Sequence, residues 1–163
     1  MGVDTMKRVT KEITILGIIV IILILMISRK DRHLKGPNPE GLSSIILVDV
    51  IDEMGVQKVT IHQQVNINNF LDIFSNTKRI DEQSISQFSS KTKFTIVLYK
   101  FKSSGNNSWR SMYEENGDFY IDQPFVGIFN INSDDLYMLD QIIKEGDKEE
   151  ILIPVNNILK SNF

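Results

Sequence analysis

The sequence contains no cysteine among its 163 residues. Disulfide bonds, thiolate metal sites, cysteine nucleophiles and a lipidated cysteine are therefore excluded. Histidine is scarce, with only His33 and His62, and no H-x-x-x-H or H-E-x-x-H spacing occurs, so we expect no zinc site. The G-x-S-x-G, P-loop and G-x-G-x-x-G patterns are absent as well. These absences predict a protein without a metal or a cofactor.

Charge is divided unevenly along the chain. Residues 1–35 carry seven Lys or Arg and three Asp or Glu, a net charge of +4, whereas the remaining residues carry eleven and eighteen, a net charge of −7. Binding to nucleic acid needs a concentrated positive face for the phosphates. The acidic composition of the longer part therefore argues against a nucleic-acid partner.

An apolar run occupies residues 13–27, where only Thr14 and Gly17 interrupt large apolar side chains and no charge occurs. Such a run, without a polar stripe at helical spacing, predicts a single transmembrane helix over residues 13–28, behind a basic region at residues 1–12. A cleaved signal peptide is the alternative, but no small-x-small cleavage pattern follows, which favours an uncleaved signal-anchor. Three Lys or Arg precede the run and four follow it, so the flanking charges do not decide its orientation.

The rest of the chain predicts a stalk and one domain. Residues 29–43 contain Gly36, Pro37, Pro39 and Gly41, which exclude helix and strand and indicate a linker. Residues 44–163 predict an α+β domain, an antiparallel sheet of about five strands covered by two short helices. The expected strands cover residues 44–51, 57–63, 94–101, 109–114 and 118–122, and the expected helices start at residues 66 and 133. Residues 151–155 suit an edge strand, because Pro154 fits only there.

Residues 119–131, FYIDQPFVGIFNI, resemble a pattern found in a family of uncharacterised small domains of low-GC Gram-positive bacteria, which usually follow a transmembrane or signal segment. The positions that match are Tyr120, Ile121, Gln123, Pro124, Gly127 and Ile128, and the conservative departures are Asp122, Phe125 and Phe129. The resemblance extends over residues 59–143. That family is a domain of unknown function, so the resemblance implies a fold and an extracytoplasmic location and brings no catalytic residues.

Aromatic side chains crowd the same part of the chain. The candidate interaction surface consists of Trp109, Tyr113, Phe119, Tyr120, Gln123, Phe125 and Phe129. In a hairpin, Trp109 and Tyr113 lie on one face, while Phe119 and Tyr120 point in opposite directions, so the aromatics cannot all enter one core. Two interpretations remain open: they cover the second face of the sheet, or they form an exposed recognition surface.

These patterns favour a non-catalytic binding or interaction domain, anchored in the cell membrane and facing the outside, with a protein or envelope component as its partner. The first alternative is a secreted or envelope enzyme with a carboxylate-based site, built from residues among Asp49, Asp52, His62, Glu114 and Asp122. The second alternative is an accessory subunit of a larger membrane complex. Gly17 is the only very small residue of the apolar run, so the small-xxx-small packing motif that favours such pairing is missing.

Overall fold

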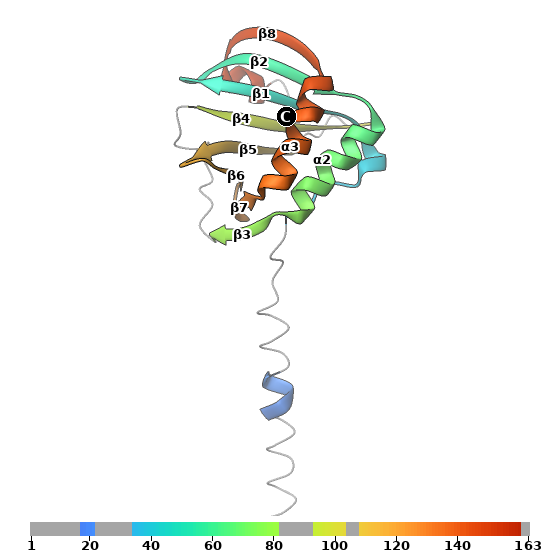
Figure 1. Ribbon diagram of the computed structural model, residues 1–163, viewed down its shortest axis with the longest axis vertical. Helices are drawn as coiled ribbons and strands as arrows, with labels where there is room; N and C mark the ends of the chain where they lie inside the picture. Colours follow the sequence, from blue (N-terminus) through green and yellow to red (C-terminus); the bar gives the residue numbers. More distant parts are fainter. Residues whose placement is uncertain (1–16, 22–33, 82–92, 104–107, 161–163) are drawn as a thin grey trace, which may run out of the picture. The chain divides into compact units, whose positions relative to one another are not determined.

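The computed structural model describes residues 17–21, 34–81, 93–103 and 108–160 (Figure 1). The chain divides into two units, residues 1–32 and residues 33–163. Of the first unit only residues 17–21 are described, and they are helical. The rest of the transmembrane helix expected at residues 13–28 lies outside the described residues.

One antiparallel sheet of eight strands forms the centre of the second unit, in the order β3-β7-β6-β5-β4-β1-β2-β8 (Figure 1). Every neighbouring pair of strands in that order is antiparallel. The strands are β1 (Leu42–Ile51), β2 (Met54–Ile61), β3 (Lys78–Asp81), β4 (Lys93–Phe101), β5 (Ser108–Glu115), β6 (Asp118–Gln123), β7 (Gly127–Ile131) and β8 (Asp147–Pro154). The two edges of the sheet are thus β3 and β8.

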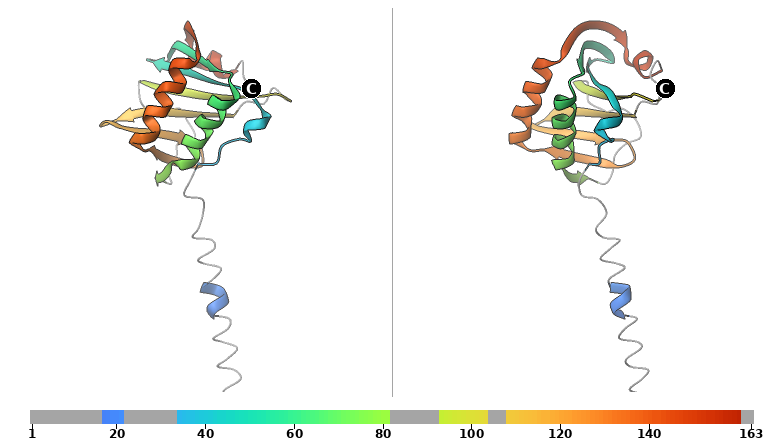
Figure 2. Two further views of the ribbon diagram at one scale, coloured as in Figure 1. Left: turned by 45° about the vertical axis from the view of Figure 1, so that its right-hand side comes forward. Right: turned by 90° about the vertical axis from the view of Figure 1, so that its right-hand side faces the viewer.

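Two helices, α2 (Gln64–Asn76) and α3 (Ser133–Glu145), lie side by side on one face of the sheet (Figure 2). A short helix, α4 (Val155–Lys160), follows β8, and a 3-10 helix, η1 (Pro39–Gly41), precedes β1. The start of α3 is capped by Asn132, whose side chain accepts a hydrogen bond from the Asp135 amide at 2.9 Å. This cap satisfies one of the amides that a helix start leaves without a partner.

The sheet separates two apolar cores. The larger core lies under α2 and α3 and includes Phe70, Phe74, Tyr99 and Phe129. The smaller core, on the opposite face, gathers side chains of β1 and β4 with Val155 and Ile158 of α4. The interior strand β1 is therefore buried on both faces, which explains why its residues 45–48 are continuously apolar instead of alternating.

The structure corrects the predicted architecture in two respects. The sheet has eight strands, not about five. In the part of the chain that is described, no helix is long and apolar enough to cross a membrane, so the expected transmembrane helix is not found there. The strands that were not expected are β3, which is only four residues long, and β7, which begins at Gly127. β8 includes the edge strand expected at residues 151–155, but it begins earlier, at Asp147, with a charged half that the sequence did not indicate.

The start of the compact unit also differs from the expected linker at residues 29–43. Leu34 is 1 % exposed and belongs to the larger core. Residues 34 and 35 therefore pack with the sheet, although the sequence predicted that the domain would begin only at residue 44.

Candidate binding surface

The aromatic residues of the candidate surface are divided between three places. Phe129 is 1 % exposed in the larger core, and Phe119 packs against the same core. Trp109 and Tyr113 are half-buried against the smaller core on the other face. Phe125 belongs to neither core and is 83 % exposed. The set therefore does not form one continuous surface.

Tyr113 and Tyr120 remain together on the face opposite to α2 and α3. They are partners in the β5–β6 register, and their ring centroids lie 5.5 Å apart. The hydroxyl of Tyr120 donates a hydrogen bond of 3.5 Å to Asp118. Partial desolvation, together with the carboxylates of Asp118 and Glu115, raises the pKa of Tyr120 above its usual value. These two tyrosines cover part of the sheet face opposite α2 and α3. Their position agrees with the interpretation that the aromatic residues cover the second face of the sheet.

Phe125 lies in the turn between β6 and β7, formed by residues 124–126. Its backbone φ is +62°, in the left-handed region that a non-glycine residue seldom adopts. The Val126 amide donates a hydrogen bond of 3.0 Å to the Gln123 carbonyl and closes the turn. Gly127 follows with a φ of +149°, which only glycine accommodates readily. The turn therefore holds a large aromatic side chain in solvent, on a strained backbone.

Arg79 on β3 holds the other side of this turn, since its guanidinium donates a hydrogen bond to the carbonyl oxygen of Val126. The residue after it, Ile80, is 55 % exposed, and Val126 is partly exposed as well. We define the β6–β7 turn surface as Ile80, Phe125 and Val126. It lies at the β3 edge of the sheet, at the lower end of the domain in Figure 1.

Arg110 holds the start of the β6–β7 turn through the Gln123 side chain, and it was not identified from the sequence. Although its side chain is charged, Arg110 is only 5 % exposed. It donates to the Gln123 side chain at 2.8 Å, to the Tyr99 hydroxyl at 2.6 Å and to the Lys35 carbonyl at 2.5 Å. Its guanidinium also lies over the rings of Tyr99 and Phe74, at 5.0 Å and 5.8 Å from their centroids.

Three parts of the sequence are thereby joined through one side chain: the segment entering the domain, the middle of the sheet, and the start of the β6–β7 turn. Burial raises the pKa of Tyr99, although the Arg110 charge and hydrogen bond act in the opposite direction. The Tyr99 hydroxyl thus stays protonated beside the guanidinium. A sequence signal for this role existed, because Arg110 stands between Trp109 and Ser111 and alternates onto the same face as Met112, which belongs to the larger core.

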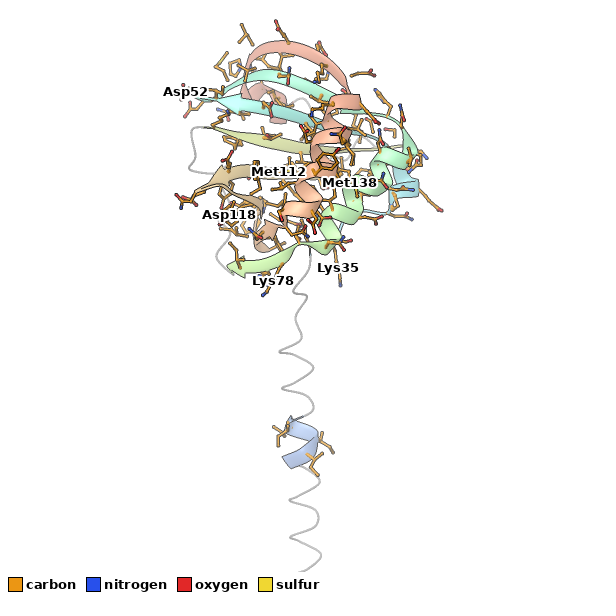
Figure 3. The ribbon with its side chains drawn as sticks, in the orientation of Figure 1. Lys35, Asp52, Lys78, Met112, Asp118 and Met138 are labelled. Atoms are coloured by element: carbon orange, nitrogen blue, oxygen red, sulfur yellow. The ribbon has the colours of Figure 1, made fainter. Side chains whose placement is uncertain are left out.

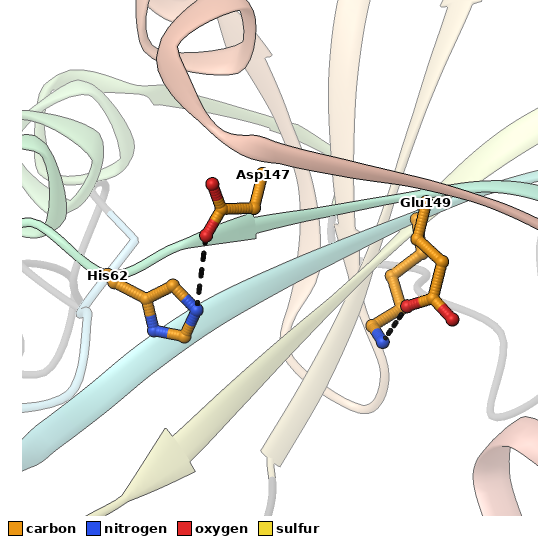
Figure 4. Close-up of polar contacts among 4 residues, drawn as sticks. His62, Asp147 and Glu149 are labelled. Carbon is orange, nitrogen blue, oxygen red and sulfur yellow. Dashed lines mark hydrogen bonds and ion pairs between the residues drawn. The ribbon is translucent and has the colours of Figure 1, made fainter.

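The groups considered for a carboxylate-based enzyme site lie on separate parts of the sheet. Asp52 is in the exposed turn before β2, whereas His62 follows the end of β2 and pairs with Asp147 at 3.7 Å (Figure 4). A strand of eight residues separates these two by roughly 25 Å. Figure 4 also shows the Lys58–Glu149 ion pair, at 2.5 Å, which joins β2 to β8.

The remaining carboxylates do not converge either. Asp49 on β1 accepts a hydrogen bond of 2.7 Å from Thr95. Glu114 is exposed on β5 opposite Phe119, while Asp122 is buried on β6 opposite Ser111, and these two pairs point to opposite faces. Within the described ranges, no three His, Cys, Asp or Glu side chains are grouped as a metal would need.

These features describe a small sheet domain that displays one aromatic turn. The chain belongs to the DUF5301 family, described as a domain of unknown function (DUF5300), whose family model matches residues 30–130. The expected resemblance to an uncharacterised domain is thus confirmed, while its membrane anchor and its bacterial group are not tested by this match.

A solved structure described as "NMR structure of the protein from Ruminococcus gnavus" is 23 % identical, with a TM-score of 0.48, and the match covers 61 % of this chain and 95 % of that one. No curated protein matches the chain.

Proposed function

We propose that this protein is a non-catalytic binding domain that makes contact through its β6–β7 turn surface. The observation that carries the proposal is Phe125, which is 83 % exposed with a φ of +62°. A left-handed backbone costs a non-glycine residue about 1–2 kcal/mol. Full burial of a phenylalanine returns about 1.5–3 kcal/mol, but Phe125 in the isolated domain gains only a small part of that. Folding alone therefore does not account for a phenylalanine here.

Contact with a partner accounts for an exposed phenylalanine at position 125. Aromatic side chains are enriched at binding surfaces, because they bury a large apolar area and lose few rotamers. The turn is held from both sides, by Arg79 at Val126 and by Arg110 at Gln123. A turn fixed in this way presents Phe125 in one orientation, which reduces the entropy that a partner must overcome on binding.

The dispersion of the acidic groups supports a non-catalytic role. General acid–base chemistry needs two groups of different protonation behaviour facing one substrate. Asp52 and His62 lie at opposite ends of β2, and Glu114 and Asp122 face opposite sides of the sheet. Binding is thus favoured over the enzyme alternative.

For the location, we propose that the apolar stretch at residues 13–27 attaches the protein to the cell membrane, with the domain outside the cytoplasm. The composition of that stretch supports attachment, since it contains no charged residue. Residues 33–163 carry twelve Lys or Arg against eighteen Asp or Glu, and long acidic domains are translocated despite basic residues near an anchor.

Single-cysteine accessibility in intact cells tests both parts, because the chain has no cysteine of its own. The two variants are Ile80→Cys, beside the turn, and Leu152→Cys on the opposite edge strand, where the native side chains are 55 % and 76 % exposed. A membrane-impermeant maleimide should label Leu152→Cys on intact cells. It should label Ile80→Cys several-fold more slowly, relative to each variant's rate in detergent.

The outcomes separate the two claims. If neither variant is labelled until the cells are opened, the extracytoplasmic location is wrong. If both are labelled at their detergent rates, nothing covers the turn surface in the cell and the binding role is wrong.

A further inference from the structure

We propose that the occupant of the β6–β7 turn surface is the membrane itself: Phe125, Val126 and Ile80 enter the interfacial layer of an anionic bilayer and hold the domain against it. This inference rests on the proposed attachment through residues 13–27 and names the partner of the proposed binding surface. Three observations lead to it: the reach of the chain, the exposed side chains, and the distribution of charge.

The number of residues between the apolar stretch and the domain limits how far apart the two can lie. Ile27 and Leu34 are seven residues apart, so the chain between them spans at most about 25 Å. Leu34 is fixed in the larger core, and Arg110 links the Lys35 carbonyl to the Gln123 side chain with hydrogen bonds of 2.5 and 2.8 Å. Gln123 is the last residue of β6 before the turn, so the chain enters the domain near the start of the β6–β7 turn.

The side chains at this end suit an interface between water and lipid. Phe125 is 83 % exposed, and Ile80 and Val126 add aliphatic surface beside it. Lys35 and Lys78, both exposed, lie at this same lower end of the domain in Figure 3. Apolar side chains with lysines around them are the pattern of a surface that lies in the headgroup layer, where the lysine ammonium groups meet lipid phosphates.

Charge distinguishes this surface from the exposed apolar positions of β8 and α3. Strand β3, KRID, carries two bases and one acid, and exposed Lys35 lies at the same end of the domain. By contrast, exposed Leu152 and Ile153 on β8 follow Glu149 and Glu150. A bilayer with negative headgroups attracts the first surface and repels the second.

The α3 helix shows the same contrast. Its exposed Tyr137 and Met138 lie between the carboxylates of Asp134, Asp135 and Asp140, with Lys144 the one base in that helix. Because residues 33–163 have six more acidic than basic residues, a local excess of positive charge selects one end of the domain. Tethering raises the effective concentration of that end at the bilayer, so a weak surface contact is sufficient.

Tryptophan quenching by brominated lipid tests the proposal on the full chain reconstituted into bilayers. Phe125→Trp and Leu152→Trp are each made in a Trp109→Phe background, because Trp109 is the only tryptophan of the chain. The lipids are a mixture of phosphatidylglycerol and phosphatidylcholine, brominated near the headgroup end of the acyl chains. We expect at least about twofold quenching for Phe125→Trp and almost none for Leu152→Trp, since an interfacial side chain reaches the bromine layer.

Bilayers of phosphatidylcholine alone provide the second arm, in which quenching of Phe125→Trp should fall markedly because the charge attraction is lost. Equal quenching in both lipids would overturn the role of anionic headgroups. No quenching of Phe125→Trp in either lipid, with the chain still in the bilayer after carbonate washing, would overturn docking and leave the attachment intact. A chain removed by carbonate would overturn the attachment and the docking together.

A third variant covers the case in which Trp109→Phe does not fold. Ile80→Cys, labelled with an environment-sensitive nitrobenzoxadiazole dye, retains both Trp109 and Phe125. Its emission should shift to the blue and brighten on anionic bilayers, whereas labelled Leu152→Cys should not change. The same emission for both labelled variants would contradict the proposal.

Discussion

Two phenylalanines four residues apart should respond to mutation in opposite ways. Phe129, 1 % exposed in the larger core, lies in the β6–β7 ladder opposite Ile121. The substitution Phe129→Ala removes a fully buried ring and leaves a cavity. It should lower the free energy of unfolding by about 3–5 kcal/mol. Since a domain of this size is stabilised by about 5–15 kcal/mol, this variant should be close to unfolding.

The Phe125→Asn variant should remain nearly as stable as the native protein. The 83 % exposure of Phe125 leaves 17 % of its surface covered, about 35 Å² of some 200 Å², so the lost burial is worth about 1 kcal/mol at most. Asparagine tolerates the positive φ of this position better than phenylalanine, which returns about 1 kcal/mol. The two terms nearly cancel, and the net change should stay within about 1 kcal/mol.

Urea unfolding followed by Trp109 fluorescence measures both variants, with the midpoint and the m-value fitted together. The native m-value should be retained by Phe125→Asn. A loss of more than about 2 kcal/mol in Phe125→Asn, well beyond the covered area, would show that Phe125 supports the fold. The argument that it is kept for contact would then fail.

The remaining predictions concern the groups that position the surface. Arg110→Met should lower the free energy of unfolding by about 2–4 kcal/mol, because the Tyr99 hydroxyl and the Gln123 amide oxygen lose their hydrogen-bond donor. Limited proteolysis of this variant should also cut faster near residue 35, and an unchanged cleavage rate would contradict the role of Arg110 in holding the entering chain. Burial raises the pKa of Tyr99 above its ordinary value of 10.0, so the folded state keeps a proton that the unfolded state releases. The free energy of unfolding should therefore fall as the pH rises past about 10, and it should fall less in Tyr99→Phe. Urea midpoints measured from about pH 9 to 11 check this. Asn132→Ala removes the α3 cap and should cost about 1 kcal/mol, whereas Asn132→Ser, which also caps and adds no charge beside Asp135, should cost less; equal losses in thermal unfolding would argue against the cap.

Several elements of the fold follow from local sequence. The run at residues 94–101 contains no breaker, and the structure confirms a strand there, β4. Asn116 and Gly117 have φ values of +56° and +85°, as the Asn-Gly hairpin predicted. Gly146 ends α3, and Pro154 lies in an edge strand, β8. In each case one residue type restricts the backbone strongly enough to be recognised in isolation.

Other elements depend on partners that are distant in sequence. β3, KRID, has no strand pattern of its own and exists because it pairs with β7. The first half of β8, DKEE, is charged, yet it pairs with β2 and includes the Lys58–Glu149 ion pair. Leu34 follows a polar segment, and its burial depends on the core that α2 supplies. Tertiary pairing thus added strands where propensity alone indicated loops.

The positions of the aromatic side chains on the sheet were predicted in part. Strand alternation correctly placed Trp109 and Tyr113 on one face, and it correctly pointed Phe119 and Tyr120 in opposite directions. Closeness in sequence was misleading for Phe129, which is a core residue of β7. The isolation of Phe125 depends on a positive φ that phenylalanine seldom adopts, and Arg110 reaches across the sheet to the entering chain. Alternation with Met112 indicates the face on which Arg110 lies, but neither the positive φ of Phe125 nor the contact of Arg110 with the Lys35 carbonyl has a local sequence signature.

Site-specific photo-crosslinking in living cells tests the central claim most directly. A diazirine amino acid is placed at position 125 in one full-length variant and at position 152, on the opposite edge strand, in the other. If the β6–β7 turn surface contacts the membrane, the first variant should form a phospholipid adduct, detected by mass spectrometry, in several-fold excess over the second. Equal adduct yields at the two positions, or none at position 125, would contradict the claim.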